Sequence, residues 1–403
     1  MKTNAEILLP SPAFNPRPLM LAYMSCTMAM MAFVALIGPM ARVLRLAAWQ
    51  AGTVVTVGGV LWMVLARAWG SASDRLGRRS VLLMGVGGFM LSYWAMCGLL
   101  LASLELLPAA ALVFAGLLLT RGAVGGFFAA IPSVGQALVA DHVSPAGRTA
   151  ALAGLGAANA IGLVLGPALA AALTPISLGL PLYVTAALPL LAFVALWRGL
   201  PRSEHHHDMP ASSVRLADPR LRRPMAVAFA AMFSVSVGQI SVGFFAIDRL
   251  GLPPEQAARA AGLALTLVGV GLILAQMAVR RLKWDSLRLI RVGAAISGLG
   301  FGAVALADSS AMLAACYFVA AAGMGWVFPA FAALASNAVS AHEQGATAGS
   351  LGAAQGLGLV LGPVVGTLFY ELGPGVPYAF IGLVLILVAA WPVAAGASVP
   401  AAE

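Results

Sequence analysis

Two arginine residues lie inside strongly apolar segments of this chain. Arg67 and Arg121 each interrupt a long run of hydrophobic residues. Burying a cation is costly unless it is paired or hydrated, so a charge inside such a segment indicates a functional site. A guanidinium group binds carboxylate and phosphate through parallel hydrogen bonds. If either arginine faces a cavity, that cavity is positive and favours an anionic or zwitterionic ligand.

Each arginine also has a simpler explanation. Arg67 lies near the end of its segment, where a long side chain can extend to the interface with water. Arg121 can equally be a structural residue that bonds to helix carbonyls. The sequence leaves both alternatives open.

The acidic residues lie outside the interior of the apolar segments that hold these arginines. All 14 fall in loops, in tails or at the ends of the apolar segments. A carboxylate in a low-dielectric cavity has a raised pKa and can exchange a proton for a ligand. This chain has no obvious group of that kind, so a lipophilic cation is a poor ligand for it.

Polar and aromatic residues of the apolar segments complete the set of ligand-binding candidates. Asn159 and Gln355 are the better ones, because they occupy equivalent places in two copies of a sequence repeat. Every candidate has an alternative role in a helix–helix hydrogen bond, worth about 0.6 kcal/mol. The candidate cavity residues are Tyr23, Thr27, Arg67, Arg121, Asn159, Gln239, Trp326 and Gln355.

Signatures of enzymes, cofactors and metal sites are missing. There is no G-x-x-x-x-G-K-[ST] run for a nucleotide, and no nucleophile–base or paired-carboxylate pattern. The run His205–His207 with Asp208 lies in a polar stretch and favours a solvated linker over a metal site. We expect no cofactor, no bound metal and no enzymatic activity.

The composition indicates a membrane protein. Of 403 residues, 61% are hydrophobic and 9% are charged, whereas soluble domains carry about 25% charged residues. The net charge of +9 does not indicate nucleic-acid binding, which needs a basic face on a soluble fold.

Twelve apolar runs are long enough to cross a bilayer, which takes about 20 residues. We expect an all-α membrane protein of the inner (plasma) membrane of a bacterial-type cell, with membrane lipid around it. The spans are 19–41, 50–70, 80–103, 108–130, 149–172, 182–200, 225–247, 257–279, 290–307, 311–337, 347–370 and 377–396.

The distribution of basic residues predicts the orientation. Placing both termini in the cytoplasm leaves only Arg42, Arg45, Arg249 and Arg259 in outside loops, as the positive-inside rule favours. The cytoplasmic segments are then a tail over 1–18, a linker over 201–223 and a tail over 397–403. A cleaved signal peptide is the weaker alternative, because the run 19–41 is too long for one.

The chain repeats itself on either side of the linker. GLVLGP occurs at 162–167 and again at 358–363, and AGTVVTVGGV at 51–60 aligns with AGLALTLVGV at 261–270. The repeats predict two six-helix bundles, 19–200 and 224–396, which rock around a central site.

The segment 70–79 matches the pattern G-x-x-x-D-R-x-G-R-R. On this motif and the repeats, the chain resembles the major facilitator superfamily over nearly its whole length, and within it the twelve-span drug:proton antiporters. The resemblance implies that the segment is a latch whose ion pairs stabilise an outward-facing state. A topology anchor is the alternative. The latch residues are Gly70, Asp74, Arg75, Gly77, Arg78 and Arg79.

Two further features carry the resemblance. The family links an arginine in the fourth span, here Arg121, to proton transfer, although Val124 replaces the usual glutamine. A glycine–proline kink in the fifth span is typical of exporters, although Ala170 and Ala171 replace a usual pair of glycines. The kink residues are Gly162, Gly166 and Pro167, with the repeat copy Gly358, Gly362 and Pro363.

The expected function is export of a small organic molecule by alternating access, coupled to proton entry. The substrate class is an anion or zwitterion, such as a siderophore or related metabolite, or a drug, and the chain is expected to act as a monomer. Either Asp74 with Arg121 carries the coupling, or the coupling differs, or transport is a uniport. The alternatives are uptake of an anionic metabolite or metal–chelate complex, and a non-transporting sensor with the same fold.

Overall fold

The computed structural model describes residues 14–143, 145–200, 218–282, 284–340 and 343–392, and these residues form helices and no strand. Expectations for 1–13, 201–217 and 393–403, including the histidine run, fall outside this part of the chain. The helices are α1 (Arg17–Val43), α2 (Ala48–Leu76), α3 (Arg78–Leu106), α4 (Ala110–Phe128), α5 (Ala130–His142), α6 (Pro145–Leu173), α7 (Leu180–Gly199), η1 (Pro219–Leu221), α8 (Arg222–Asp248), α9 (Pro254–Leu282), α10 (Ser286–Val304), α11 (Ser310–Ser336), α12 (Gln344–Tyr370) and α13 (Val376–Ala390).

The helices correspond to the twelve predicted spans. Among the described residues, 11 helical segments are long and apolar enough to cross a membrane, counting α4 and α5 together. The twelfth, α13, is apolar but shorter. The prediction of an all-α, twelve-span membrane protein is confirmed.

Several predicted boundaries differ from the observed ones. The fourth span was predicted to end at residue 130 but continues to His142, with a break between α4 and α5 at Ala129. Pro132 explains the break, because a proline removes one helix hydrogen bond and crowds the carbonyl four residues before it. At the predicted linker, the chain is already helical from Pro219, and α8 begins at Arg222.

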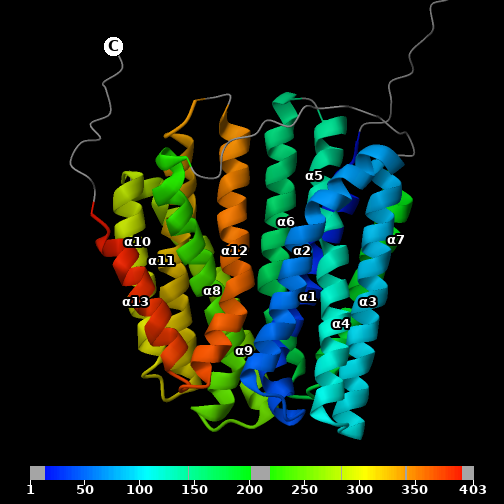
Figure 1. Cartoon of the computed structure of the whole chain (residues 1–403), viewed down its shortest axis with the longest axis vertical. Coiled ribbons are helices and arrows are strands. Elements are labelled where there is room, and N and C mark those ends of the chain that lie inside the picture. Colours follow the sequence, from blue (N-terminus) through cyan, green and yellow to red (C-terminus); the bar gives the residue numbers. More distant parts are fainter. Residues whose placement is uncertain (1–13, 144, 201–217, 283, 341–342, 393–403) are drawn as a thin grey trace, which may run out of the picture.

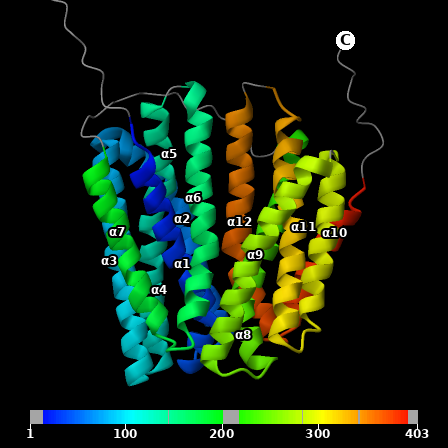
Figure 2. The ribbon, with the colours of Figure 1, turned by 180° about the vertical axis from the view of Figure 1, so that it is seen from behind.

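Two groups of helices stand side by side (Figures 1 and 2). Helices α1–α7 form one group and η1 with α8–α13 form the other. The groups meet where α1 packs on α8 and α9, α2 packs on α12, and α6 packs on α9. We call the upper end in Figure 1, where α2 meets α3, the motif end, and the other the opposite end.

Repeated glycines pack the same way in both groups. An added Cβ at Gly162 of α6 would lie 2.5 Å from the carbonyl oxygen of Met24 in α1. At Gly358 of α12 it would lie 2.7 Å from that of Phe229 in α8. Since small residues let helices approach closely, the two GLVLGP copies direct equivalent helix pairs together.

Candidate transport site

The segment 70–79 is mostly helical rather than a loop. Helix α2 continues through Asp74 to Leu76, and α3 begins at Arg78. Gly77 alone separates the helices, with φ of 88°. Residues with a side chain rarely adopt this conformation, so a glycine suits the tight turn between α2 and α3.

Arg78 is the centre of the ion pairs in this segment. Its guanidinium contacts the carboxylate of Asp74, and its Nε donates to Oδ2 of Asp141 at 2.8 Å. Its Nη1 also donates to Oγ of Ser73 at 2.6 Å. Arg78 therefore ties the motif-end termini of α2, α3 and α5 together.

The other motif residues contribute less to this cluster. Arg75 is exposed at the end of α2, and Gly70 has open space around its Cα. Arg79 donates from Nη2 to the carbonyl oxygen of Trp197 at 2.7 Å, which links α3 to α7. All of these contacts lie within the first group, so none of them joins the two groups in this conformation.

Arg121 is buried in the middle of the first group. Only 4% of the residue is exposed. Its guanidinium lies 5.8 Å from the ring centroid of Phe33 in α1, and it occupies the space that a side chain at Gly58 of α2 would need. Its Nη1 has no hydrogen-bond partner, and no acidic residue of the described ranges pairs with it. The guanidinium thus lacks an acidic partner among the described residues and is almost fully buried in this conformation.

Arg67 has a different environment. It is exposed on the motif-end half of α2, one turn beyond Met63. The sulfur of Met63 lies 4.0 Å from an added Cβ at Gly356 of α12. Arg67 is therefore beside the region where the two groups separate.

The predicted kink prolines lie where the groups meet. An added Cβ at Gly52 of α2 would lie 2.5 Å from the carbonyl oxygen of Pro363 in α12. At Gly262 of α9 it would lie 2.6 Å from that of Pro167 in α6. The two contacts are equivalent in the repeats, and we call them the proline seams.

The seams close one end of the molecule only. Gly52, Gly262, Pro167 and Pro363 all lie toward the opposite end of their helices. Toward the motif end, small residues on α6 and α12 are exposed instead. The exposed residues are Ala153, Gly156, Ala157 and Ala160 on α6, with Gly349, Gly352 and Ala353 on α12. The groups are therefore in contact at the opposite end and apart at the motif end.

Four candidate cavity residues bond within their own group. The hydroxyl of Tyr23 donates to the carbonyl oxygen of Pro132 at 3.2 Å, and Thr27 donates to Oδ1 of Asn159 at 2.7 Å. The indole of Trp326 donates to the carbonyl oxygen of Ala275 at 3.0 Å. These bonds fit the helix–helix alternative. Gln239 and Gln355 are partly buried on α8 and α12.

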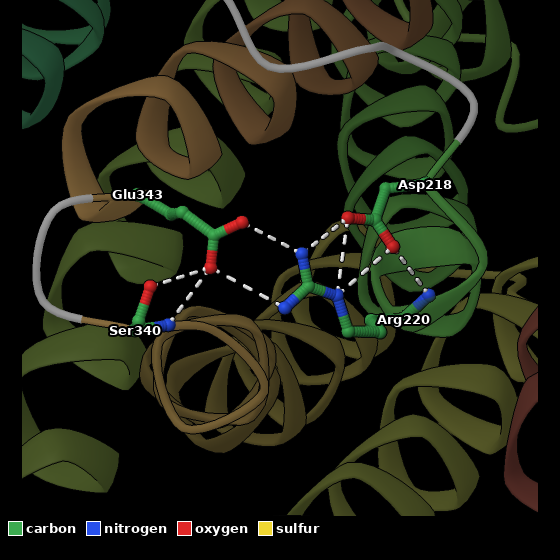
Figure 3. A network of polar contacts seen from close by, with 4 residues as sticks. All are labelled: Asp218, Arg220, Ser340 and Glu343. Carbon is green, nitrogen blue, oxygen red and sulfur yellow. Dashed lines mark hydrogen bonds and ion pairs between the residues drawn. The ribbon is translucent and has the colours of Figure 1, made fainter.

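A second charged cluster lies at the motif end of the other group (Figure 3). Arg220 in η1 bonds Asp218 at 2.7 Å and Glu343 at 2.8 Å, and Ser340 donates to Glu343 at 2.7 Å. Arg220 and Ser340 hold the pKa of Glu343 at about 2, so it stays ionised at physiological pH. The cluster ties the start of α8 to the connection between α11 and α12.

The sequence did not predict the acidic partners of the arginines in these two clusters. Asp141 lies beyond the predicted end of the fourth span, and Glu343 is 123 positions from Arg220. No local pattern marks either acid. Their only signal is that each is an acidic residue just outside an apolar run at the predicted cytoplasmic side.

The structure is that of a multi-pass membrane protein with two related groups of helices, the first of which encloses a buried arginine. The sequence matches the Major Facilitator Superfamily over residues 19–264 and 250–400. The chain therefore belongs to this family, whose members transport small molecules and are not enzymes.

Individual relatives agree with this assignment. The chain is 28% identical over 338 residues to the class G tetracycline resistance protein of Vibrio anguillarum, covering 80% of this chain and 81% of that one. It is 28% identical over 333 residues to the class C protein of Escherichia coli, covering 79% of each. The fold resembles a bacterial homolog of the human lysosomal transporter Spinster, in an inward-facing and occupied conformation. The TM-score is 0.71 with 18% identity, over 93% of both chains.

Proposed function

We propose that this transporter exports a small organic molecule from the cytoplasm in exchange for protons. The observation that carries the proposal is the one-sided closure of the molecule at the proline seams. A protein that opens at one end and closes at the other has the geometry of alternating access. Export is supported by the tetracycline resistance proteins, which the chain resembles over about four fifths of its length.

The motif end is the cytoplasmic end in this proposal, and the membrane is a bacterial inner membrane. Arg75, Arg78 and Arg79 lie where α2 meets α3, and Arg220 lies in η1 at the start of α8, in agreement with the positive-inside rule. Exposed faces of α6 and α12 at this end then receive substrate from the cytoplasm. Since α1–α13 contain both groups, a single chain supplies the whole pathway, and we infer that it acts as a monomer.

The substrate is an anion or a zwitterion. Arg121 lacks an acidic partner among the described residues, and Arg67 is exposed where the groups separate. No described acidic residue lies in the middle of a span to offset a cationic substrate. A carboxylate-rich metabolite such as a siderophore, or an anionic drug, fits this charge distribution.

Comparing a deletion strain with its parent tests direction and charge. Negative-ion mass spectrometry of cells and medium, under iron starvation and iron repletion, is the measurement. We expect an anion that disappears from the medium of the deletion strain and accumulates inside it. An anion that instead remains in the medium of the deletion strain would show uptake and contradict export.

Inside-out membrane vesicles test the coupling. The anion identified above should accumulate in vesicles that hold the protein when a proton gradient is imposed, and a protonophore should stop this. Asp74→Asn should abolish accumulation without reducing membrane insertion. Asp308→Asn, a substitution in an exposed loop, should leave accumulation unchanged. Accumulation that persists without a gradient would exclude proton antiport.

A further inference from the structure

Three arginines at the motif end of the second group differ from the paired arginines of this chain. Arg42 of α1 pairs with Asp248 of α8 at 2.6 Å, and Arg78 and Arg220 each contact two acids. The ion pairs of the described residues include none of the three that we call the arginine cluster. The arginine cluster consists of Arg223, Arg288 and Arg291.

The sequence repeat shows which acid the second group has lost. The alignment of AGTVVTVGGV with AGLALTLVGV, continued along the chain without a gap, places Arg288 opposite Arg78 and Trp284 opposite Asp74. The guanidinium of Arg78 contacts the carboxylate of Asp74. The guanidinium of Arg288 instead lies 4.4 Å from the ring centroid of Trp284. An ion pair in the first group thus corresponds to a cation–π contact in the second.

The other acid that binds Arg78 is missing from the second group as well. Pro132 and Pro329 are 197 positions apart, close to the 196 positions between the GLVLGP copies. Asp141 lies nine residues after the first proline, and Ala338 lies nine residues after the second. A ring attracts a cation but does not neutralise it, so the charge of Arg288 remains open to an anion.

Arg223 and Arg291 converge on the end of α13. Nη2 of Arg223 donates to the carbonyl oxygen of Trp391 at 3.1 Å, and Nη2 of Arg291 donates to the same oxygen at 3.5 Å. Nη1 of Arg223 donates to the carbonyl oxygen of Pro392 at 3.5 Å, whereas its Nε has no hydrogen-bond partner. Carbonyls at a helix C-terminus carry only partial negative charge. The described residues therefore do not neutralise the two like charges that they bring together.

The arginine cluster is on the lipid-facing side of the protein. In Figures 1 and 2, α10 and α13 lie on the side of the second group that is turned away from the first. Arg288 and Arg291 are exposed on α10, and Trp391 is 39% exposed at the end of α13. Tryptophan and arginine at the ends of spans are typical of the headgroup level of a bilayer.

We propose that the arginine cluster, with Trp284 and Trp391, binds the phosphate of an anionic phospholipid from the leaflet at the motif end. Guanidinium groups present paired donors that match phosphate oxygens, while the acyl chains stay in the bilayer beside α10 and α13. The phosphate supplies the negative charge that Asp74 and Asp141 supply in the first group. The site goes beyond the proposed function, because it lies outside the substrate pathway and depends neither on export nor on orientation.

The charge around the arginine cluster favours an anionic headgroup over a zwitterionic one. Asp285 follows Trp284 and is exposed, but it belongs to none of the ion pairs of the described residues. Glu343 already bonds Arg220 and Ser340. Three cations thus outnumber the acid beside them, so phosphatidylglycerol is a better ligand than phosphatidylcholine, whose choline adds a positive charge.

Native mass spectrometry of the full chain, stripped of lipid in detergent, tests the site with phosphatidylglycerol as the probe. We expect the wild-type protein to retain this lipid. Its apparent affinity should fall about fivefold for each arginine lost, and so about 25-fold in Arg223→Gln/Arg291→Gln. Because Arg291 is exposed, Arg291→Gln alone should fold and show the fivefold decrease if the double variant does not fold.

A matched variant and two other ligands control this measurement. Arg17→Gln/Arg198→Gln removes two exposed arginines at the motif end of the first group, so it should keep the wild-type affinity. Phosphatidylcholine should bind the wild-type protein about fivefold more weakly, as for the loss of one charge. Excess inorganic phosphate should not displace the lipid, because it lacks acyl chains.

Four outcomes would overturn the proposal. They are unchanged affinity in Arg291→Gln, an equal loss of lipid in the two double variants, equal binding of the two lipids, and displacement by inorganic phosphate. The last would identify a soluble anion as the ligand. The measurement requires no transport, so it stands apart from the export assay.

Discussion

Arg78 and Arg121 are both mostly buried, yet they have opposite surroundings. Arg78 has two carboxylates and a hydroxyl around it. Arg121 has an aromatic ring and an unpartnered Nη1. A buried charge without a partner is destabilising unless something else requires it. We infer that Arg78 positions helix ends and that Arg121 is retained for transport.

Arg78→Gln should destabilise the motif end of the first group. The variant leaves Asp141, whose side chain is only 11% exposed, without its charged partner. Such a loss costs about 1–3 kcal/mol. Thermal unfolding in detergent should show the decrease, and the exposed Arg75→Gln should not. Equal stability of the two variants would contradict the bridging role of Arg78.

Arg121→Met should separate stability from transport. Methionine fills similar space and removes the uncompensated charge, so the thermal stability should be unchanged or higher. Transport of the anionic substrate should fall by about tenfold or more, as expected for the loss of a hydrogen bond to a charged group. Wild-type transport by this variant would show that Arg121 has only a structural role.

The paired helices α6 and α12 show how single elements are positioned. Each carries a GLVLGP copy whose glycines lie against the backbone of α1 or α8. In α12, Pro363 leaves the carbonyl of Leu359 without its helix N–H, and Ser236 of α8 donates to that oxygen at 3.2 Å. Helix α8 thus satisfies the carbonyl that Pro363 leaves without a partner, while the carbonyl of Pro363 itself faces Gly52 of α2 in the seam.

Alanine substitutions along α12 should have opposite effects. Gly358→Ala should destabilise the second group by about 1–3 kcal/mol, because the new methyl meets the backbone of Phe229 and Phe233. Gly352→Ala meets nothing within 4 Å and should be neutral or stabilising by about 0.5–1 kcal/mol, since glycine weakens a helix. Thermal unfolding of both variants checks the difference, and a reversed order would refute the packing role of Gly358.

At the scale of the whole molecule, the two groups behave as bodies joined by a few close contacts. The proline seams and the Arg42–Asp248 pair lie toward one end, and the exposed faces of α6 and α12 lie toward the other. Separation at the motif end is therefore compatible with tight packing inside each group.

Gly52→Ala and Gly262→Ala should shift the balance between the closed and the open state of the opposite end. Each new methyl meets a proline carbonyl of the other group, so each should disfavour closure without unfolding either group. A clash of about 1.4 kcal/mol changes the open-to-closed ratio tenfold. Leu106 and Leu306 are exposed at the opposite end, one in each group, so spin labels at Leu106→Cys and Leu306→Cys measure this ratio by double electron–electron resonance. If Gly52→Ala shifts it and Gly262→Ala does not, the seams are not equivalent.

Apolar runs and repeats were sufficient to predict twelve helices and two related sets of them, because length and hydropathy govern insertion into a bilayer. The turn at Gly77 was also predictable, since glycine tolerates its backbone conformation. Span ends were less predictable. Helix α5 extends past the apolar run to Asp141, because hydropathy marks where a helix leaves lipid and not where it ends.

The sequence by itself determined the family, the number of membrane-spanning segments, the lack of acids in the middle of the spans and the two arginines within them. Only the tertiary structure decided which charges pair. Arg78 with Asp141 and Arg42 with Asp248 depend on the rotation and tilt of helices that are far apart in the chain. The tertiary structure also decided which end is closed. Closure depends on contacts between the two groups of helices. The fold within each group is compatible with more than one position of the groups relative to each other.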